Sequence, residues 1–231
     1  MRTDHLPESV FWCVATIALY LAARWWHGRR PHWWNAPLLV TPVILVSLAL
    51  VFHAGYRDYS RGAHWMIALL GPATVAFAVP IYDQRRLIRR YWPVLIFGVL
   101  AGSVTAMVSA WALATSLGLS GSMRLSLLPR SVSTPFAMAV SGDIGGVPDL
   151  TAVFVVLTGV FGAAVGEFIL VVVPLRSGVA RGALYGMGAH GAGVAKAHLT
   201  GPEEGSIAGL VMVLAGLMNV LAAPLVAAIL H

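Results

Sequence analysis

Four ionisable side chains lie within or beside long apolar stretches of the sequence, and they are the residues best suited to chemistry. Arg130 carries a planar guanidinium fork that can hold a carboxylate through two hydrogen bonds. His190 can gain or lose a proton near neutral pH, while Glu167 and Lys196 add one more acid and one more base. Because charges are costly in apolar surroundings, these residues are candidates for ligand binding and proton coupling.

Each of these side chains also has a plainer explanation, which the sequence leaves open. Arg130 and Lys196 can extend along an apolar surface and place their charges at a membrane–water interface. His190 can simply form a hydrogen bond with a neighbouring helix. Glu167 lies seven residues before Pro174 and can reach the headgroup region. Charge in an apolar stretch therefore selects candidates without assigning their roles.

The segment that carries Arg130 is broken by prolines at residues 129–146, PRSVSTPFAMAVSGDIGG. Pro135 removes a backbone donor, and Pro129 restricts the residue before it. Backbone groups near Ser133 and Thr134 are therefore left without helical partners, and they must find neighbours, water or a ligand. This pattern predicts a discontinuous helix that lines a site.

The segment that carries His190 is broken by glycines at residues 186–197, GMGAHGAGVAKA. Glycines at this density, among them Gly191 and Gly193, either let helices pack closely or expose their backbone to a ligand. A third broken stretch, GPATVAFAVPIY at residues 71–82, offers only freed backbone. We expect that stretch to serve mainly as scaffold.

The composition determines the class of protein that must position these residues. The chain is 58% hydrophobic and 10% charged, with a mean hydropathy of +0.81, whereas soluble domains carry about 25% charged residues. This composition predicts an all-α polytopic integral membrane protein whose surroundings are a lipid bilayer. The net charge of +6 does not indicate nucleic-acid binding, because the arginines lie between apolar runs instead of forming one basic face.

About eight hydrophobic segments approach the roughly 20 residues that a bilayer span requires. They form a single predicted transmembrane domain over residues 1–231, with the breaks described above inside some of them. The expected segments are residues 9–25, 37–54, 63–82, 92–117, 125–142, 149–174, 179–198 and 206–230.

Two basic clusters predict the topology of the first half. Positive residues in short loops stay on the cytoplasmic side, which places the N-terminus outside. The positive residues of the second half give no consistent topology, because eight alternating spans put Arg176 and Arg181 outside and Lys196 inside. A re-entrant segment at residues 125–142 therefore remains an alternative. The clusters follow the first and third segments and consist of Arg24, Arg29 and Arg30, and of Arg85, Arg86, Arg89 and Arg90.

The positions of prolines suggest an internal repeat. Pro37 and Pro42 open the second segment much as Pro129 and Pro135 open the fifth. This spacing gives two three-span units, residues 37–117 and 125–198, with flanking spans at 9–25 and 206–230. An odd number of spans inverts the second unit relative to the first, an arrangement typical of secondary transporters with broken helices.

Sequence signatures of enzymes are not found. The chain has no P-loop, no HExxH and no GxSxG motif, and Cys13 is its single cysteine. A lone cysteine excludes an intrachain disulfide. The sequence also has no cluster of cysteine and histidine residues at the spacing of metal ligands. We therefore expect no enzyme activity, no cofactor and no metal.

Four long motifs follow one another along residues 35–230: GPATVAFAVPIY, LLPRSVSTPFAMAVSGDIGG, DLTAVFVVLTGVFGA and ARGALYGMGAHGAGVAKA. Together they resemble the LrgB/CidB family of bacterial membrane proteins. The resemblance gives added weight to Arg130, Thr134, Pro135 and His190, which fall within these motifs. The family motif usually reads GTAKA or GTARA where this chain has GVAKA, so Val194 replaces a hydroxyl residue while Lys196 still matches.

The resemblance implies two descriptions of activity. LrgB-like proteins are described as antiholin-like or holin-like modulators of murein hydrolase activity and autolysis in the bacterial cytoplasmic membrane, usually with a small LrgA/CidA-type partner. A similar plastid protein, in which both parts are fused, is a glycolate/glycerate translocator, and bacterial relatives are linked to pyruvate uptake.

The broken motifs favour a carrier, with a small monocarboxylate or 2-hydroxycarboxylate bound between the breaks at 129–141 and 186–197. Arg130 would hold the carboxylate, and freed amides would complete an anion site. A non-transporting regulatory subunit and an ungated channel are the alternatives. Gly98 and Gly102 could pack spans together in a homodimer or equally within one subunit. The expected binding residues are Arg130, Ser133, Thr134, Pro135, His190, Gly191 and Gly193, and the expected coupling residues are His190, Glu167 and Lys196.

Overall fold

The computed structural model describes residues 6–30, 32, 35–76 and 78–230, which form helices joined by turns and loops, with no strand among them. The prediction of an all-α protein is confirmed. Three of the described helices are long and apolar enough to cross a bilayer: α6 (Arg85–Ser116), α9 (Pro148–Val172) and α11 (Pro202–Leu230). A fourth apolar helix, α2 (Pro37–Val51), is shorter. With the composition of the chain, these helices identify a membrane protein.

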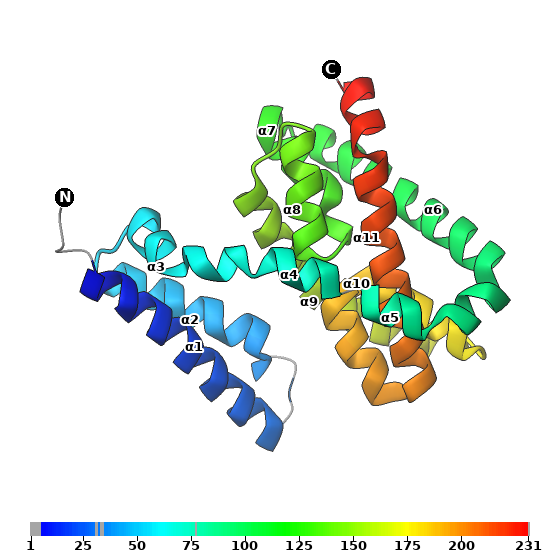
Figure 1. Cartoon of the computed structure of the whole chain (residues 1–231), viewed down its shortest axis with the longest axis horizontal. Coiled ribbons are helices and arrows are strands. Elements are labelled where there is room, and N and C mark those ends of the chain that lie inside the picture. Colours follow the sequence, from blue (N-terminus) through cyan, green and yellow to red (C-terminus); the bar gives the residue numbers. More distant parts are fainter. Residues whose placement is uncertain (1–5, 31, 33–34, 77, 231) are drawn as a thin grey trace. The chain divides into compact units, whose positions relative to one another are not determined.

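The chain divides into two compact units, residues 1–72 and 73–231. In the first unit, α1 (Leu6–Arg29) packs against α2 and against α3 (Tyr56–Ala68); Figure 1 draws these helices in blue to cyan. The buried Trp12 ring of α1 meets the Tyr59 ring of α3 edge to face, with 5.8 Å between the ring centroids. The single transmembrane domain expected over residues 1–231 stays a prediction.

A buried asparagine closes the turn between α1 and α2. Asn35 Nδ2 donates a hydrogen bond to the Arg30 carbonyl at 2.6 Å, and Asn35 Oδ1 accepts one from the His32 amide at 3.0 Å. The same Oδ1 lies 2.6 Å from His27 Nδ1. These contacts satisfy backbone groups at the end of α1 that have no partner inside the helix.

The broken stretch at residues 71–82 forms parts of two short helices, α4 (Leu70–Ala76) and α5 (Ala78–Asp83). Phe77, between them, lies outside the described residues. Within the described residues, the apolar segment expected at residues 63–82 is interrupted by a turn at Leu69, between α3 and α4. Gly71 and Pro72 follow the turn at Leu69, and both residue types weaken a helix interior.

In the second unit, α6 bends near its start. Tyr91 has non-helical backbone angles (φ −115°, ψ 16°), and Pro93 follows two residues later. Proline lacks an amide hydrogen and its ring collides with the carbonyl four residues earlier, which accounts for a kink at this position. The first turns of α6 therefore follow a different direction from the longer apolar part.

The segment that carries Arg130 is discontinuous, as predicted. It consists of α7 (Gly121–Leu127), the 3₁₀ helix η3 (Leu128–Ser131) and α8 (Thr134–Asp143), with extended backbone at Val132 and Ser133. Pro129 and Pro135 each lie in the first turn of their helix, where the missing amide costs no hydrogen bond.

Three fully buried hydroxyl residues tie this segment to α9. Thr151 Oγ1 lies 2.7 Å from Ser141 Oγ and 3.0 Å from the Ser126 carbonyl oxygen. Ser126 Oγ accepts a hydrogen bond from the Val147 amide at 2.8 Å. Because α7, α8 and α9 each supply one of these residues, the cluster sets how the three helices pack.

The apolar core of the second unit lies along α11. Phe136 of α8 packs directly on Gly216, where an added Cβ would overlap the phenyl ring. Asn219 joins α11 to α6, because its Nδ2 donates hydrogen bonds to Ser103 Oγ at 2.9 Å and to the Ala215 carbonyl at 2.7 Å. The buried core residues are Leu95, Val99, Val132, Phe136, Ala137, Val155, Ile207, Leu210, Val211 and Ala215.

The helix α10 (Gly178–Thr200) folds back on itself at His190, which has φ 35° and ψ −120°. A Cβ on Gly193 would overlap the carbonyl of Tyr185. In a continuous helix these two residues, eight positions apart, would be separated by about 12 Å along the axis. Gly178 and Gly201, at the two ends, both lie against the Glu204 carboxylate. The α10 segment is therefore a helical hairpin with its tip at His190 and both ends on one side.

The hairpin differs from the span expected at residues 179–198. The fold-back lies here, at His190, whereas the sequence left a re-entrant segment open at residues 125–142. The tip meets α9 near that helix's midpoint, since a Cβ on Gly159 would lie 2.8 Å from His190 Cε1. About twelve residues of helix reach roughly 18 Å, which is more than half of a bilayer's hydrocarbon thickness.

Candidate functional site

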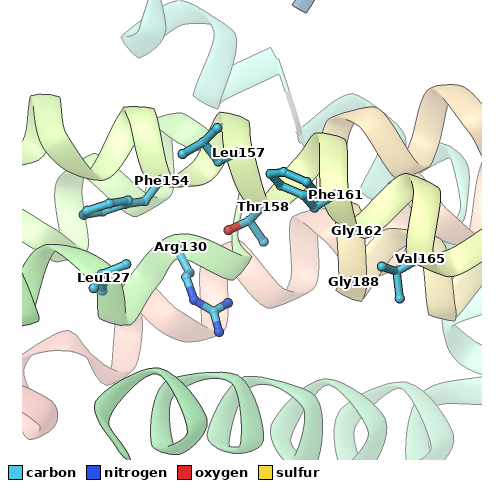
Figure 2. Close-up of a pocket in the computed structure, with 9 residues that line it drawn as sticks. All are labelled: Leu127, Arg130, Phe154, Leu157, Thr158, Phe161, Gly162, Val165 and Gly188. Atoms are coloured by element: carbon cyan, nitrogen blue, oxygen red, sulfur yellow. The ribbon is translucent and has the colours of Figure 1, made fainter. Parts of the chain in front are cut away.

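A groove between η3 and α9 contains Arg130, the arginine predicted to bind a carboxylate. The groove has a volume of about 530 Å³. The second unit supplies all of its lining, from the end of α7, η3, α9 and the first half of α10. Its lining residues, drawn in Figure 2, are Leu127, Arg130, Phe154, Leu157, Thr158, Phe161, Gly162, Val165 and Gly188.

Arg130 supplies the one charge in this lining. Its side chain is half-buried, and Nη1 donates a hydrogen bond to Ser131 Oγ at 3.1 Å. In Figure 2 the guanidinium extends from η3, and Thr158 lies between the rings of Phe154 and Phe161 on α9. The groove thus combines a cation, a hydroxyl group and an apolar wall.

The α9 side of the groove follows from helical spacing. Residues three, four and seven positions apart share one face of a helix, so this stretch of α9 presents a continuous wall. Gly162 allows the close approach of α10, because a Cβ there would overlap the Gly188 carbonyl. The wall residues are Phe154, Leu157, Thr158, Phe161, Gly162 and Val165.

His190 lies at the tip of the α10 hairpin and is 5% exposed. Its positive φ is a conformation that glycine adopts easily and other residues adopt at a cost of about 1–3 kcal/mol. Its Nε2 is buried and has no hydrogen-bond partner among the described residues. Strain and an unpaired ring nitrogen together single out this residue, although it does not line the Arg130 groove.

Three glycines on one face of α9 receive the first half of the hairpin. Gly159 contacts His190, and Gly162 contacts Gly188. Gly166 faces the Tyr185 ring, because a Cβ on this glycine would lie 3.1 Å from Tyr185 Cε1. Small residues at this spacing let helix backbones approach closely in membranes. The groove and the hairpin tip therefore share the same stretch of α9.

Ser133 precedes the first residue of α8 and is buried. Its hydroxyl makes no capping bond, and Thr134 and Pro135 begin the helix beside it. Buried polar atoms normally have partners. Within the described residues, four buried side-chain atoms lack one, and two of the four lie at the predicted breaks. The four are Thr41 Oγ1, Arg124 Nε, Ser133 Oγ and His190 Nε2.

Glu167 and Lys196 form an ion pair, with 3.0 Å between Oε1 and Nζ. Their side chains are 60% and 35% exposed, and neither lines the groove. The fold-back of α10 explains the pairing, because it returns Lys196 to the side of α9. Gly191 faces open space, whereas Gly193 packs against the first half of its own hairpin.

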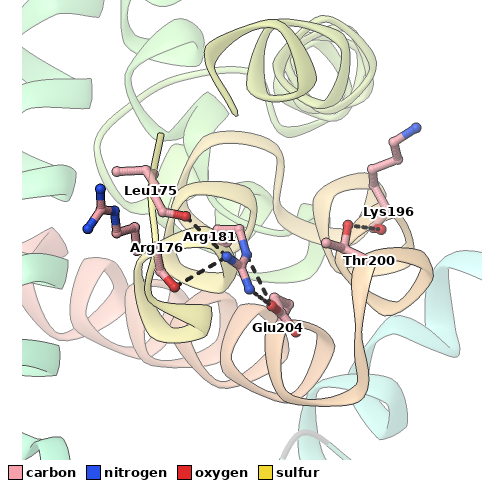
Figure 3. A network of polar contacts seen from close by, with 6 residues as sticks. All are labelled: Leu175, Arg176, Arg181, Lys196, Thr200 and Glu204. Atoms are coloured by element: carbon pink, nitrogen blue, oxygen red, sulfur yellow. Dashed lines mark hydrogen bonds and ion pairs between the residues drawn. The ribbon is translucent and has the colours of Figure 1, made fainter. Parts of the chain in front are cut away.

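A second ion pair, not anticipated from the sequence, closes the base of the hairpin. Arg181 Nε donates to Glu204 Oε1 at 3.1 Å, Nη2 contacts the same oxygen, and Nη1 donates to the Leu175 carbonyl at 3.1 Å. Figure 3 shows this network, with the Lys196 ammonium pointing away from it. Glu204 is 7% exposed. The pair joins α10 to α11 and holds the loop before α10.

Thr158 was also missed by sequence reasoning. A threonine in an apolar helix often bonds only its own backbone, so its residue type gave no signal. Its spacing did carry one, because Thr158 precedes Gly162 by four residues and shares that glycine's face. Arg181 lies nine residues before His190, where α10 folds back, and only the hairpin brings it to Glu204.

Comparison with known proteins agrees with the motifs quoted above. The profile of the LrgB-like family matches residues 16–229. The chain belongs to the LrgB-like family. Its resemblance to this family, inferred from the motifs, is confirmed.

Relatives of this LrgB-like protein occur in Bacillus subtilis (strain 168). Uncharacterized protein YwbG is 41% identical over 90% of this chain and 93% of its own length. Uncharacterized protein YxaC is 34% identical over 94% of this chain and 95% of its own length. Antiholin-like protein LrgB is 31% identical over 81% of each chain. No solved structure matches the chain.

Proposed function

We propose that this LrgB-like protein is a secondary carrier for small monocarboxylates or 2-hydroxycarboxylates, of the pyruvate, glycolate and glycerate type. The observation that supports it most is the Arg130 groove, whose lining contains this arginine and no other charged residue. Its volume of about 530 Å³ falls within the range of small-molecule sites. A guanidinium pairs with a carboxylate bidentately.

The chemistry of the lining favours a small organic anion over an inorganic one. Thr158 offers a hydroxyl that can bond an oxygen on the second carbon, and Phe154 and Phe161 provide an apolar wall for the remaining carbons. An inorganic anion would leave that wall without a partner. A single arginine neutralises a single carboxylate, which favours a monocarboxylate.

The hairpin tip would supply the coupling step. Transporter sites form where helices are broken, because half-helices expose backbone and polar groups near the midplane. His190 packs against Gly159 and has an unpaired Nε2, and this ring would carry a proton. Glu167 and Lys196 would respond through their ion pair, since a proton on Glu167 would release Lys196. Ser133, Thr134, Pro135, Gly191 and Gly193 would complete the site at the two breaks.

The proposal includes a membrane setting. The protein would be a multi-pass protein of the bacterial cytoplasmic membrane with its N-terminus outside, as the two arginine clusters favour. The repeat of residues 37–117 and 125–198 stays a prediction, whereas the segments expected at 63–82 and 179–198 differ from single spans as described above. An LrgA/CidA-like membrane protein and a second copy of the chain are the proposed partners.

A second candidate function is a non-transporting, antiholin-like regulator of murein hydrolase activity. Its support is the name of one relative, Antiholin-like protein LrgB, at 31% identity. This function would act through contacts with a partner and would not need a groove with a guanidinium. It predicts no solute flux from the purified protein, with or without an LrgA-like partner.

Uptake of labelled pyruvate and glycolate into proteoliposomes tests the proposal. We expect saturable uptake by the wild type that depends on a pH gradient, and loss of uptake in Arg130→Ala. Arg176→Ala is the matched control, because Arg176 is exposed and lies outside the groove. Wild-type uptake by Arg130→Ala would refute the assigned site. Absence of flux in every preparation that contains folded protein would favour the regulator.

A further inference from the structure

A second groove lies at the start of α6, away from the residues assigned to transport. Its volume is about 690 Å³. It is bounded by α5 on one side and by the first two turns of α6 on the other. Its lining residues are Ala78, Ile81, Tyr82, Arg85, Ile88, Arg89 and Trp92.

The lining of this groove is amphiphilic. Arg85 and Arg89 are four residues apart and share one face of α6, and Ile88 and Trp92 continue the groove with apolar surface. None of the ion pairs formed by the described residues involves Arg85 or Arg89. Two guanidinium groups without an acidic partner therefore lie at one part of an apolar groove.

Arg85 is held in place by α5. Its Cζ lies 4.4 Å from the centroid of the Tyr82 ring, and its Nη1 donates a hydrogen bond to the Tyr82 carbonyl at 3.0 Å. Guanidinium has five N–H donors, so donors beyond the one used here stay open to a ligand. The stacking orders this side chain in advance of binding.

The groove lies before the bend in α6, next to the part of that helix that can cross a bilayer. Arg85 and Arg89 precede the non-helical residue Tyr91, and the apolar part of α6 that can cross a bilayer follows it. Tyr82 and Trp92 are exposed aromatic residues of the kind that occupies the headgroup level. In a bilayer crossed by the apolar part of α6, these cations would lie at headgroup depth beside the apolar side chains of Ile88 and Trp92.

We propose that this groove binds one anionic phospholipid, with its phosphate on Arg85 and Arg89 and its acyl chains against Ile81, Ile88 and Trp92. The charges are complementary, and basic pockets at membrane surfaces suit anionic headgroups. Inorganic phosphate would use the arginines but leave the apolar wall bare. The proposal is independent of transport, because none of these residues belongs to the Arg130 groove.

The test uses the full-length protein in mixed micelles, titrated with phosphatidylglycerol or with phosphatidylcholine, with bound lipid counted by native mass spectrometry. We expect retention of about one phosphatidylglycerol. At about 1 kcal/mol for each arginine, Arg85→Gln with Arg89→Gln should weaken binding roughly 20- to 30-fold. Arg86→Gln with Arg90→Gln removes the same charge from the same turns outside the groove, and should change binding less than about 3-fold.

Three results would overturn the proposal. Equal losses from both pairs would show diffuse attraction instead of a groove. Equal retention of phosphatidylcholine would exclude recognition of the charge, and displacement by millimolar inorganic phosphate would exclude the lipid as the bound species. If the double variant does not fold, Arg89→Gln against Arg86→Gln provides the same comparison, with an expected loss of about 5-fold for Arg89→Gln alone.

Discussion

The contact between His190 and Gly159 offers a quantitative check on the α10 hairpin. A Cβ placed on Gly159 would lie 2.8 Å from His190 Cε1 and 3.4 Å from Nδ1 of the same ring. Its third neighbour, Ala192 Cβ, is at an ordinary contact distance of 3.5 Å. Gly159→Ala should therefore collide with one side chain, that of His190.

The expected magnitude follows from this geometry. Overpacking a filled contact costs about 1–3 kcal/mol, while replacing a helical glycine by alanine gains about 0.5–1 kcal/mol. Gly159→Ala should therefore destabilise the wild type. In a His190→Gly background the collision is absent, and glycine also accepts the positive φ at this position. There Gly159→Ala should be neutral or stabilising, which gives a coupling free energy of about 1–3 kcal/mol.

The assay is thermal unfolding of the four proteins of this cycle in one detergent. For a chain of this size each kcal/mol shifts the Tm by about 2–4 °C. Gly98→Ala on α6 is the control, because an added Cβ there meets nothing within 4 Å. If Gly159→Ala lowers the Tm equally in both backgrounds, His190 does not pack on Gly159 and the hairpin tip is placed incorrectly.

Three further predictions concern the packing around the site. Gly162→Ala would push a methyl group into the Gly188 carbonyl, so we expect a loss of about 1–3 kcal/mol in unfolding free energy, measured by denaturation against Gly98→Ala; an unchanged stability would contradict the close approach of α9 and α10. Thr151→Val leaves buried Ser126 and Ser141 oxygens without this hydroxyl and should cost about 1–3 kcal/mol by the same assay, whereas the exposed Ser109→Ala should cost none. Glu204→Gln removes the partner of Arg181, so amides at the start of α10 should exchange hydrogen faster in mass spectrometry; wild-type exchange would show that the pair does not hold the hairpin base.

The sequence predicted the class of the fold and the positions of both breaks. Apolar composition indicated a helical membrane protein, and Pro129 and Pro135 marked the interruption that separates α7, η3 and α8. The LrgB-like resemblance, which rested on long motifs, was confirmed. These features are local, because proline geometry and apolar length act within a few residues of the sequence.

The fold-back of α10 was not predicted, because it depends on one residue. Glycines around His190 suit a close-packed continuous helix as well as a hairpin, and the turn itself occurs at a histidine with positive φ. That conformation is rare for residues other than glycine, so residue type pointed away from it. Packing against Gly159 and the Arg181–Glu204 pair hold it, and both are contacts distant in sequence.

The candidate site shows the same division. Arg130 was selected from its charge in an apolar stretch and lies in a groove, whereas Thr158 across that groove was missed. Glu167 was interpreted as an acid inside an apolar run, and the structure pairs it with Lys196 at 3.0 Å on an exposed surface. This ion pair depends on the fold-back of α10, so the sequence of α9 alone could not predict it.

The central claim is that Arg130 binds the carboxylate of a small organic anion. Isothermal titration of the purified protein with pyruvate tests it most directly, with Arg130→Ala and the exposed control Arg176→Ala measured alongside the wild type. A hydrogen bond to a charged group contributes about 1.5–3 kcal/mol, so Arg130→Ala should weaken binding by roughly 10- to 150-fold while Arg176→Ala binds as the wild type does. Binding of pyruvate to folded Arg130→Ala with wild-type affinity would contradict the claim.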